Sequence, residues 1–172
     1  IASGDDTRYA VDALGQYVEQ VAGAALTPEA KALLLSDALE IAAGNPAIGP
    51  ERAARLKAII LGRVGETKTF QGLILAGKYL DDPDKAVRSA AASAVINAAL
   101  AHKEYYGPVV ENLLRRSADI TEGQDSSYLR EQIRKHLADM PKSSGFVSMF
   151  NGKDLAGWKG LVENPIARAN MK

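Results

Sequence analysis

Three aspartates, Asp81, Asp82 and Asp84, lie around Pro83 and could bring several carboxylate oxygens together. Hard cations such as Ca²⁺ bind groups of this kind, but a calcium loop also needs a glycine and a closing glutamate, and both are missing here. We therefore favour a structural role over a cation site. Asp82 is expected to cap a helix, Pro83 to open its first turn, and Asp84 to complement the helix dipole.

The sequence does not indicate a metal site or a catalytic nucleophile built from histidine, serine or cysteine. His102 and His136 lie 34 residues apart, and neither belongs to a His-x-x-x-His or Glu-x-x-His metal motif. Ser126 and Ser127 begin a predicted helix and are interpreted as caps. Cysteine is absent, which excludes disulfides, thiolate metal sites and cysteine nucleophiles. There is no glycine-rich phosphate-binding loop either, so we predict no catalytic, metal-binding or cofactor-binding residue and no cofactor.

Basic residues and tyrosines suggest two weaker alternatives, a nucleic-acid surface and a sugar-stacking surface. The chain has 21 basic and 21 acidic residues, so no overall field attracts a polyanion, and solvated helix faces are favoured. Tyr105 and Tyr106 are expected at the core or its rim, where helical tyrosines usually lie. The basic groups are Arg52, Arg55, Lys57 and Arg63 on one predicted helix, and Arg115, Arg116, Arg130, Arg134 and Lys135 on another surface.

The chain that positions these residues is predicted to be helical over most of its length. Alanine and leucine are abundant, aromatic residues make up only 6%, and apolar residues recur at spacings of three and four. Short connections favour antiparallel neighbours. The pattern predicts an all-α fold of about seven helices, at about 5–24, 27–43, 50–62, 67–80, 83–101, 103–118 and 126–140.

Each predicted helix carries an apolar stripe that we expect to face the core. The helix at 83–101 is rich in alanine, so its neighbours must approach closely. The residues expected to face inward are Ala10, Leu14, Tyr17, Val18, Val21, Ala30, Leu33, Leu34, Ala38, Ile41, Leu56, Ile59, Ile60, Phe70, Leu73, Ile74, Tyr79, Val87, Ala91, Ala94, Val95, Ala98, Tyr106, Val109, Val110, Leu113, Leu114, Leu129, Ile133 and Leu137.

A weak internal repeat connects two of these helices. The segment Ala-Val-Arg-Ser-Ala-Ala at 86–91 is echoed by Tyr-Leu-Arg-Glu-Gln-Ile at 128–133, 42 residues later. A period near forty with two helices per unit is typical of HEAT arrays. Residues 66–101 resemble that family, with a helix ending in leucine, an aspartate-rich turn with proline, and Val-Arg before an alanine-rich helix.

The HEAT resemblance implies an α-α superhelix, that is, an armadillo-type solenoid. Its three units would pair the helices 27–43 with 50–62, 67–80 with 83–101, and 104–118 with 126–140, and the first helix would cap them. In such arrays the turn aspartates and the arginine usually bond across to the adjacent repeat. The resemblance therefore implies this structural role for Asp82, Asp84 and Arg88.

The sequence changes character after residue 141. Residues 142–145 are predicted to be a linker. Phe146 to Phe150 alternate as in a strand, and Asn151-Gly152 is typical of a tight turn, so we expect a short extended tail. We expect Phe146, Phe150 and Trp158 to be buried, because a two-stranded element is not stable by itself.

The string Met-Phe-Asn-Gly-Lys-Asp-Leu-Ala-Gly-Trp at 149–158 resembles the opening of the 3-keto-disaccharide hydrolase family. The resemblance implies a concanavalin-like β-sandwich of exported bacterial proteins that cleaves glycosides oxidised at the third carbon. It also implies a periplasmic or secreted location. Only residues 146–172 match, so we expect them to be the N-terminal fragment of that domain and assign no catalytic residue.

The leading hypothesis is a non-catalytic helical-repeat scaffold or interaction domain, residues 1–141, from a larger exported bacterial protein. The parent protein is expected to be a glycoside-cleaving hydrolase. Expected partners are the neighbouring domain of the same polypeptide and a protein or glycan. No apolar run of eighteen residues occurs, so we expect no membrane span. Two alternatives remain open: helices that shape the substrate cleft of the hydrolase, and a nucleic-acid-binding helical repeat.

Overall fold

The computed structural model of the chain describes residues 4–123 and 126–141, with side chains from Arg8 onward. All regular secondary structure in these two ranges is helical, which confirms the predicted all-α fold and its seven helices. The helices are α1 (Gly4–Gly23), α2 (Pro28–Gly44), α3 (Pro50–Thr67), α4 (Phe70–Gly77), α5 (Lys85–Ala101), α6 (Pro108–Ile120) and α7 (Ser126–Asp139).

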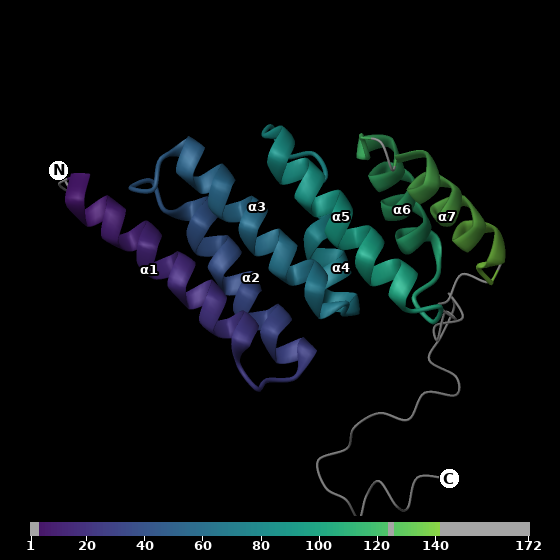
Figure 1. Cartoon of the computed structure of the whole chain (residues 1–172), viewed down its shortest axis with the longest axis horizontal. Coiled ribbons are helices and arrows are strands. Elements are labelled where there is room, and N and C mark those ends of the chain that lie inside the picture. Colours follow the sequence, from purple (N-terminus) through teal and green to yellow (C-terminus); the bar gives the residue numbers. More distant parts are fainter. Residues whose placement is uncertain (1–3, 124–125, 142–172) are drawn as a thin grey trace, which may run out of the picture.

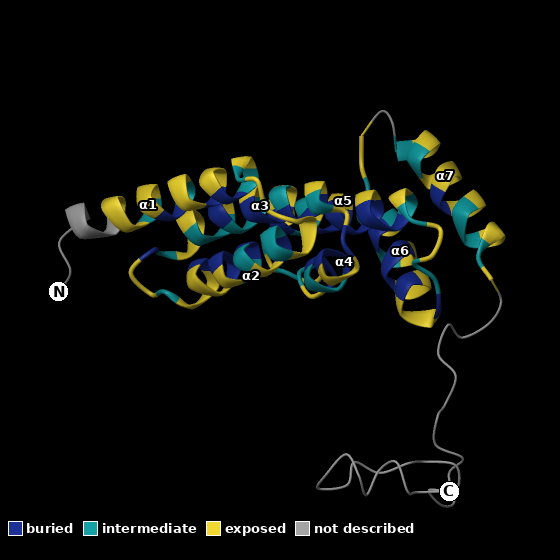
Figure 2. Cartoon of the chain, turned by 90° about the horizontal axis from the view of Figure 1, so that it is seen from below, coloured by how far each residue is buried: buried dark blue, intermediate teal, exposed yellow. Residues whose placement is uncertain are grey.

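The helices follow one another along the long axis of the molecule (Figure 1). Seen from below, α1, α3 and α5 lie in one layer, α2, α4 and α6 lie in a second layer, and α7 stands at the end of the row (Figure 2). Each helix packs mainly on helices near it in the chain, and α5 is shared by α3, α4 and α6. The core is therefore a continuous strip between the two layers.

Helix α5 provides the closest packing. Its predicted inward residues are all buried, including Val87, Ala94 and Val95. A Cβ atom added to Gly65 of α3 would lie 2.8 Å from Ala94 Cα. No real Cβ fits at that distance, so the backbones of α3 and α5 meet without a side chain between them.

Most helix starts follow the capping pattern read from the sequence. Thr27 Oγ1 accepts a hydrogen bond from Ala30 N at 3.3 Å, and the adjacent proline begins α2. Three starts, those of α4, α5 and α6, were wrongly predicted. Helix α5 begins after Asp84, not after Asp82, because Asp84 Oδ1 accepts from Ala86 N at 2.8 Å and Val87 N at 3.1 Å. Helix α6 begins at Pro108, because Gly107 has φ 111° and cannot continue a helix.

Helix α3 is longer and α4 shorter than predicted. The glycines at 62 and 65 do not end α3, which continues to Thr67 and stops at Lys68, a residue in the left-handed region with φ 52°. Thr69 then caps α4 through a hydrogen bond from Gly72 N to its Oγ1, at 3.0 Å. The close contact with α5 requires glycine at position 65, whereas position 62 has no such neighbour.

Several residues that were expected to face inward lie at the surface instead. The exposed fractions are 65% for Leu33, 50% for Ile41, and 52% for both Ile59 and Val109. These helices are apolar on more than one face, and the packed neighbours cover only one stripe. Ala10, Tyr17 and Phe70 were also predicted inward and are exposed.

The predicted linker at 142–145 and the predicted β-sandwich fragment at 146–172 lie outside the described residues. The same holds for the predicted burial of Phe146, Phe150 and Trp158. These expectations stay predictions.

Replacing Gly65 by alanine is expected to destabilise the fold by ~1–3 kcal/mol, because the added methyl group forces α3 and α5 apart. Gly62→Ala is the matched control, since it lies in the same helix and an added Cβ has nothing within 4 Å. That control should leave stability unchanged or raise it by up to ~1 kcal/mol through helix propensity. Urea unfolding followed by circular dichroism measures both, and equal effects would contradict the close contact.

Candidate functional site

The three aspartates around Pro83 do not converge on one point. Asp81 Oδ2 accepts from Arg116 Nη2 of α6 at 2.6 Å. Asp82 forms an ion pair with Lys57 of α3, and its second oxygen accepts from Asp84 N at 2.9 Å. Asp84 is the N-cap of α5. Within the part of the chain that the structure describes, no group of three histidine or acidic residues could hold a metal ion.

Lys57 and Asp82 form the most deeply buried ion pair among the described residues, with side chains only 15% and 7% exposed. The pair borders a surface hollow of about 560 Å³ between the start of α3 and the turn before α5. The ammonium group of Lys57 also lies 6.0 Å from the centre of the Tyr79 ring. Because both charges satisfy each other, this cluster fixes the turn against α3 and offers no free nucleophile.

The pKa of Tyr79 is affected by burial and by the charge of Asp82 in this cluster. Burial raises the pKa of its phenol above 10.0, and the negative charges of Asp82 and Glu40 raise it further. A phenol that holds its proton so firmly stays neutral at physiological pH. It therefore packs beside the Lys57–Asp82 pair as a half-buried ring and does not act as a base.

Arg88 and Arg130, which stand at matching places in the two similar sequence segments, both donate to backbone carbonyls. Arg88 donates from Nη1 to the carbonyls of Asp82 and Pro83, at 2.6 and 2.9 Å. Arg130 donates to the carbonyls of Ala118 and Thr121, at 3.1 and 2.8 Å. Arg88 thus ties α5 to the turn directly before it, whereas Arg130 ties α7 to the C-terminal end of α6. Of the three residues expected to bond across to neighbouring helices, Asp82 does so through Lys57 of α3. The expectation was wrong for Asp84 and Arg88, whose bonds stay at the start of α5, and Asp81 adds a connection to α6.

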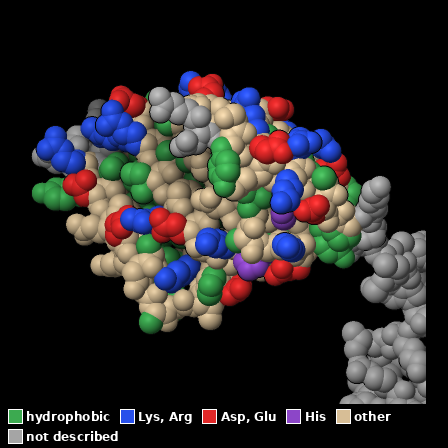
Figure 3. All heavy atoms as spheres, turned by 45° about the vertical axis from the view of Figure 1, so that its right-hand side comes forward, with side chains coloured by type: hydrophobic (Ala, Val, Ile, Leu, Met, Phe, Trp, Pro, Cys, Tyr) green, Lys and Arg blue, Asp and Glu red, His purple; other side chains and the backbone are tan. Residues whose placement is uncertain are grey.

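Most of the basic residues that could have formed a nucleic-acid surface form ion pairs with aspartate or glutamate. Arg55 pairs with Glu51, and Arg63 pairs with both Glu19 and Glu66. On the other surface, Arg115 pairs with Glu111, Arg116 with Asp81, and Arg134 with Glu131. Acidic and basic side chains intermingle on the face seen in Figure 3. This mixture weakens the field that a phosphate backbone would need.

One face of the Tyr105 ring is already covered by another ring. His102 stacks on it with ring centroids 4.6 Å apart, and Phe70 meets it edge-on at 5.3 Å. His102 is also bonded through Nδ1 to Glu104 Oε1 at 2.9 Å. The three rings form a small aromatic cluster that joins the start of α4 to the loop before α6.

His136 of α7 is half-buried, and its Nε2 atom has no hydrogen-bond partner among the described residues. Burial lowers the pKa of this imidazole below 6.5; Asp139 raises it and Lys103 lowers it. The neutral form is therefore favoured in the folded protein. Helix α7 begins at Ser126, so Ser126 and Ser127 are helical residues of its first turn and not the caps that the sequence predicted.

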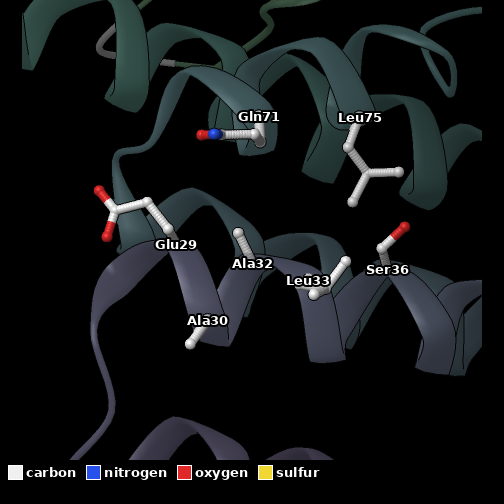
Figure 4. Close-up of a pocket in the computed structure, with 7 residues that line it drawn as sticks. All are labelled: Glu29, Ala30, Ala32, Leu33, Ser36, Gln71 and Leu75. Carbon is white, nitrogen blue, oxygen red and sulfur yellow. The ribbon is translucent and has the colours of Figure 1, made fainter. Parts of the chain in front are cut away.

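The feature that the sequence reading missed is an apolar hollow of about 390 Å³ between α2 and α4. Leu33, whose side chain is mostly exposed, lies along it, and Leu75 of α4 points toward α2 from the opposite wall (Figure 4). The run Ala32-Leu33-Leu34-Leu35 was the available signal, because four consecutive apolar residues cannot all face one side of a helix. The lining consists of Glu29, Ala30, Ala32, Leu33, Ser36, Gln71 and Leu75.

Acidic residues follow this hollow along α2. Glu29 lies four residues before Leu33, and Asp37 and Glu40 lie four and seven residues after it. At this helical spacing all three share the face of α2 that carries Leu33. The salt bridges of the described residues include no basic partner for any of the three. The lysine of the same helix, Lys31, donates instead to the carbonyl of Ala22 at 2.7 Å. We call this surface, with the hollow, the α2–α4 groove.

Comparison of the chain with protein-family models, with curated proteins and with solved structures gives no match. None of the described helices is both long and apolar enough to cross a membrane.

Lys57→Met is expected to destabilise the protein by ~2–4 kcal/mol, because it leaves the Asp82 carboxylate buried without its counter-charge. Arg55→Met is the matched control from the same helix. The Arg55–Glu51 pair is 75% and 80% exposed, so its loss should cost less than ~0.5 kcal/mol. Both values come from urea unfolding, and comparable losses in the two variants would contradict the structural role of Asp82.

His136 is expected to make stability depend on pH below neutrality. Burial lowers the pKa of His136 in the folded state, so the unfolded chain takes up a proton more readily than the folded protein does. The contribution of His136 to the free energy of unfolding is therefore fully present above the unfolded pKa of 6.5 and is lost as the pH falls through the folded-state pKa. His136→Gln should flatten this part of the stability profile, whereas His102→Gln controls for the loss of an imidazole. Unfolding at a series of pH values is the measurement. A profile unchanged by His136→Gln would contradict the burial of this ring.

Proposed function

We propose that residues 1–141 are a HEAT-like helical-repeat scaffold, an armadillo-type α-α superhelix, within a larger exported bacterial protein. The alternation of helices between two layers supports this proposal. So do Arg88 and Arg130, which lie 42 residues apart and both donate to backbone carbonyls that precede their own helices. An array of this kind acts by holding other modules in place.

The α2–α4 groove is the observation that carries the interaction role. Leu33 and Ile41 leave apolar surface on α2 uncovered by the described residues, and the groove between α2 and α4 is concave. Exposed apolar surface that lines a groove is typical of a docking site. The scaffold therefore offers this groove to a partner.

The neighbouring module is a carbohydrate-active domain that begins at residue 146. Its string at 149–158 resembles the start of the 3-keto-disaccharide hydrolase family. The catalytic residues belong to that domain, which would act on 3-keto-glycosides in the periplasm or outside the cell. The helices position the domain and do not perform the hydrolysis.

A protein surface suits the groove better than a glycan does. Its seven lining residues are mainly alanine and leucine, with no aromatic ring on which a sugar could stack. Apolar side chains gain free energy from the removal of their surface from water, and aliphatic partners provide that. For this reason, docking of the neighbouring domain is favoured over a substrate cleft formed by the helices.

The proposal is tested in the longer polypeptide that continues past Lys172. Leu33→Lys places a charge in the groove and should release the neighbouring domain, which increases the radius of gyration in small-angle X-ray scattering. Ile59→Lys is the matched control, since Ile59 is similarly exposed but lies on α3. Unchanged scattering of Leu33→Lys would contradict the docking role. Turnover of a 3-keto-glycoside by residues 1–172 alone would contradict the scaffold role.

A further inference from the structure

We propose that the occupant of the α2–α4 groove is the chain's own segment 146–158, with Trp158 as the anchor. This inference rests on the proposed function, because it uses the same groove as the docking surface. The segment contains the apolar residues Phe146, Val147, Met149, Phe150, Leu155 and Trp158. Large aromatic side chains of this kind dominate the energy of docking when they enter an apolar hollow.

Charge favours this occupant. Residues 142–172 contain five of the 21 basic residues but only two of the 21 acidic residues, so they carry a net charge of +3 and residues 1–141 carry −3. The segment 146–158 itself contains one basic and one acidic residue, Lys153 and Asp154, and Lys159 follows it directly. The α2 side of the groove is acidic, since Glu29 lines the hollow and Asp37 and Glu40 continue its face of the helix, whereas Lys78 lies at the end of α4. Lys153 and Lys159 can thus approach acids of α2 that lack a basic partner among the described residues.

The tether is long enough to reach the groove. Trp158 lies 17 residues beyond Pro141, and an extended chain of that length spans ~56 Å at ~3.3 Å per residue. Helix α4 contacts α6, because a Cβ added to Gly77 would lie 2.7 Å from Leu113 Cδ2, and α6 packs on α7. The α4 wall is therefore two helix spacings, ~20 Å, from α7. Even an added offset of one helix length, ~21 Å for α7, stays within reach.

The apolar surface on both sides would be covered by this arrangement. Trp158 would pack between Leu33 and Leu75, and the lysines would lie over the acidic residues of α2. An indole ring buried in this way is shielded from water and from soluble quenchers. The neighbouring domain would then be attached to the scaffold through its first segment as well as through the linker at 142–145.

Trp158 is the single tryptophan of the chain, so its fluorescence reports on this segment directly. The experiment uses the chain 1–172. The wild type should show blue-shifted emission and weak quenching by acrylamide. Leu33→Lys should shift the emission to the red and increase the quenching constant several-fold, because it removes apolar contact and repels the lysines. Ile59→Lys, at a similarly exposed position on α3, should leave both signals at their wild-type values.

Helix content by circular dichroism shows whether each variant is folded. If Leu33→Lys lowers the helix content, Leu33→Gln replaces it, because glutamine is polar and favours helices. Two results would overturn the inference: a wild-type Trp158 that is fully accessible to acrylamide, or a protected Trp158 that both groove variants leave protected. Protection that disappears on dilution would also overturn it, because the groove of a second copy would then be the site.

Failure of this inference is distinguishable from failure of the proposed function. An accessible Trp158 in the chain 1–172, together with release of the neighbouring domain by Leu33→Lys in the longer polypeptide, would leave the scaffold role standing with another part of the domain in the groove. Unchanged scattering in the longer polypeptide would remove the docking role itself.

Discussion

The contact between Gly65 of α3 and Ala94 of α5 is the constraint on which the arrangement depends. The two backbones meet with no side chain at position 65, and α5 in turn packs on α4 and α6. A bulkier residue at either position would displace α5 and, with it, both of its other partners. Close packing of small residues leaves little room for relaxation, so the register between the helices is fixed at this point.

Polar interactions then set the orientation of the turns around that contact. Asp82 connects the turn before α5 to α3, whereas Asp81 connects the same turn to α6. Two adjacent residues therefore reach opposite neighbours. The exposed Asp81–Arg116 pair contributes little to the free energy of unfolding. The buried Asp82–Lys57 pair is costly to disrupt, because either charge would be left buried without a counter-charge. Pairs of this kind select one packing among several of similar apolar area.

The sequence predicted the helices well because their signals are local. Thr27 and Pro28 mark the start of α2, and the stripe of Val87, Ala94 and Val95 identifies the buried face of α5. The choice between Asp82 and Asp84 as the cap of α5 was not local. Both are good caps, and the decision depends on Lys57, 25 residues earlier, which engages Asp82. The spacing of residues around Pro83 does not show that Lys57 pairs with Asp82.

The groove was missed for a related reason. Helix α2 is apolar on two faces, and periodicity does not show which face the neighbouring helices cover. Leu33 and Ala38 were both expected in the core, yet Ala38 is buried and Leu33 is not. The side that stays open depends on where α3 and α4 pack. The same argument accounts for Ile59 and Val109, whose helices also carry surplus apolar residues.

Helix α7 is attached by less buried surface than the helices in the middle of the row. Ile133 is its single fully buried residue among those described, whereas α5 has eight. In an array held by nearest-neighbour contacts, the end element opens at the lowest free energy. Helix α1, at the other end of the described row, buries three residues, Leu14, Val18 and Val21. Stiffness is therefore expected to be greatest around α5 and to fall toward both ends of the row, most steeply toward α7.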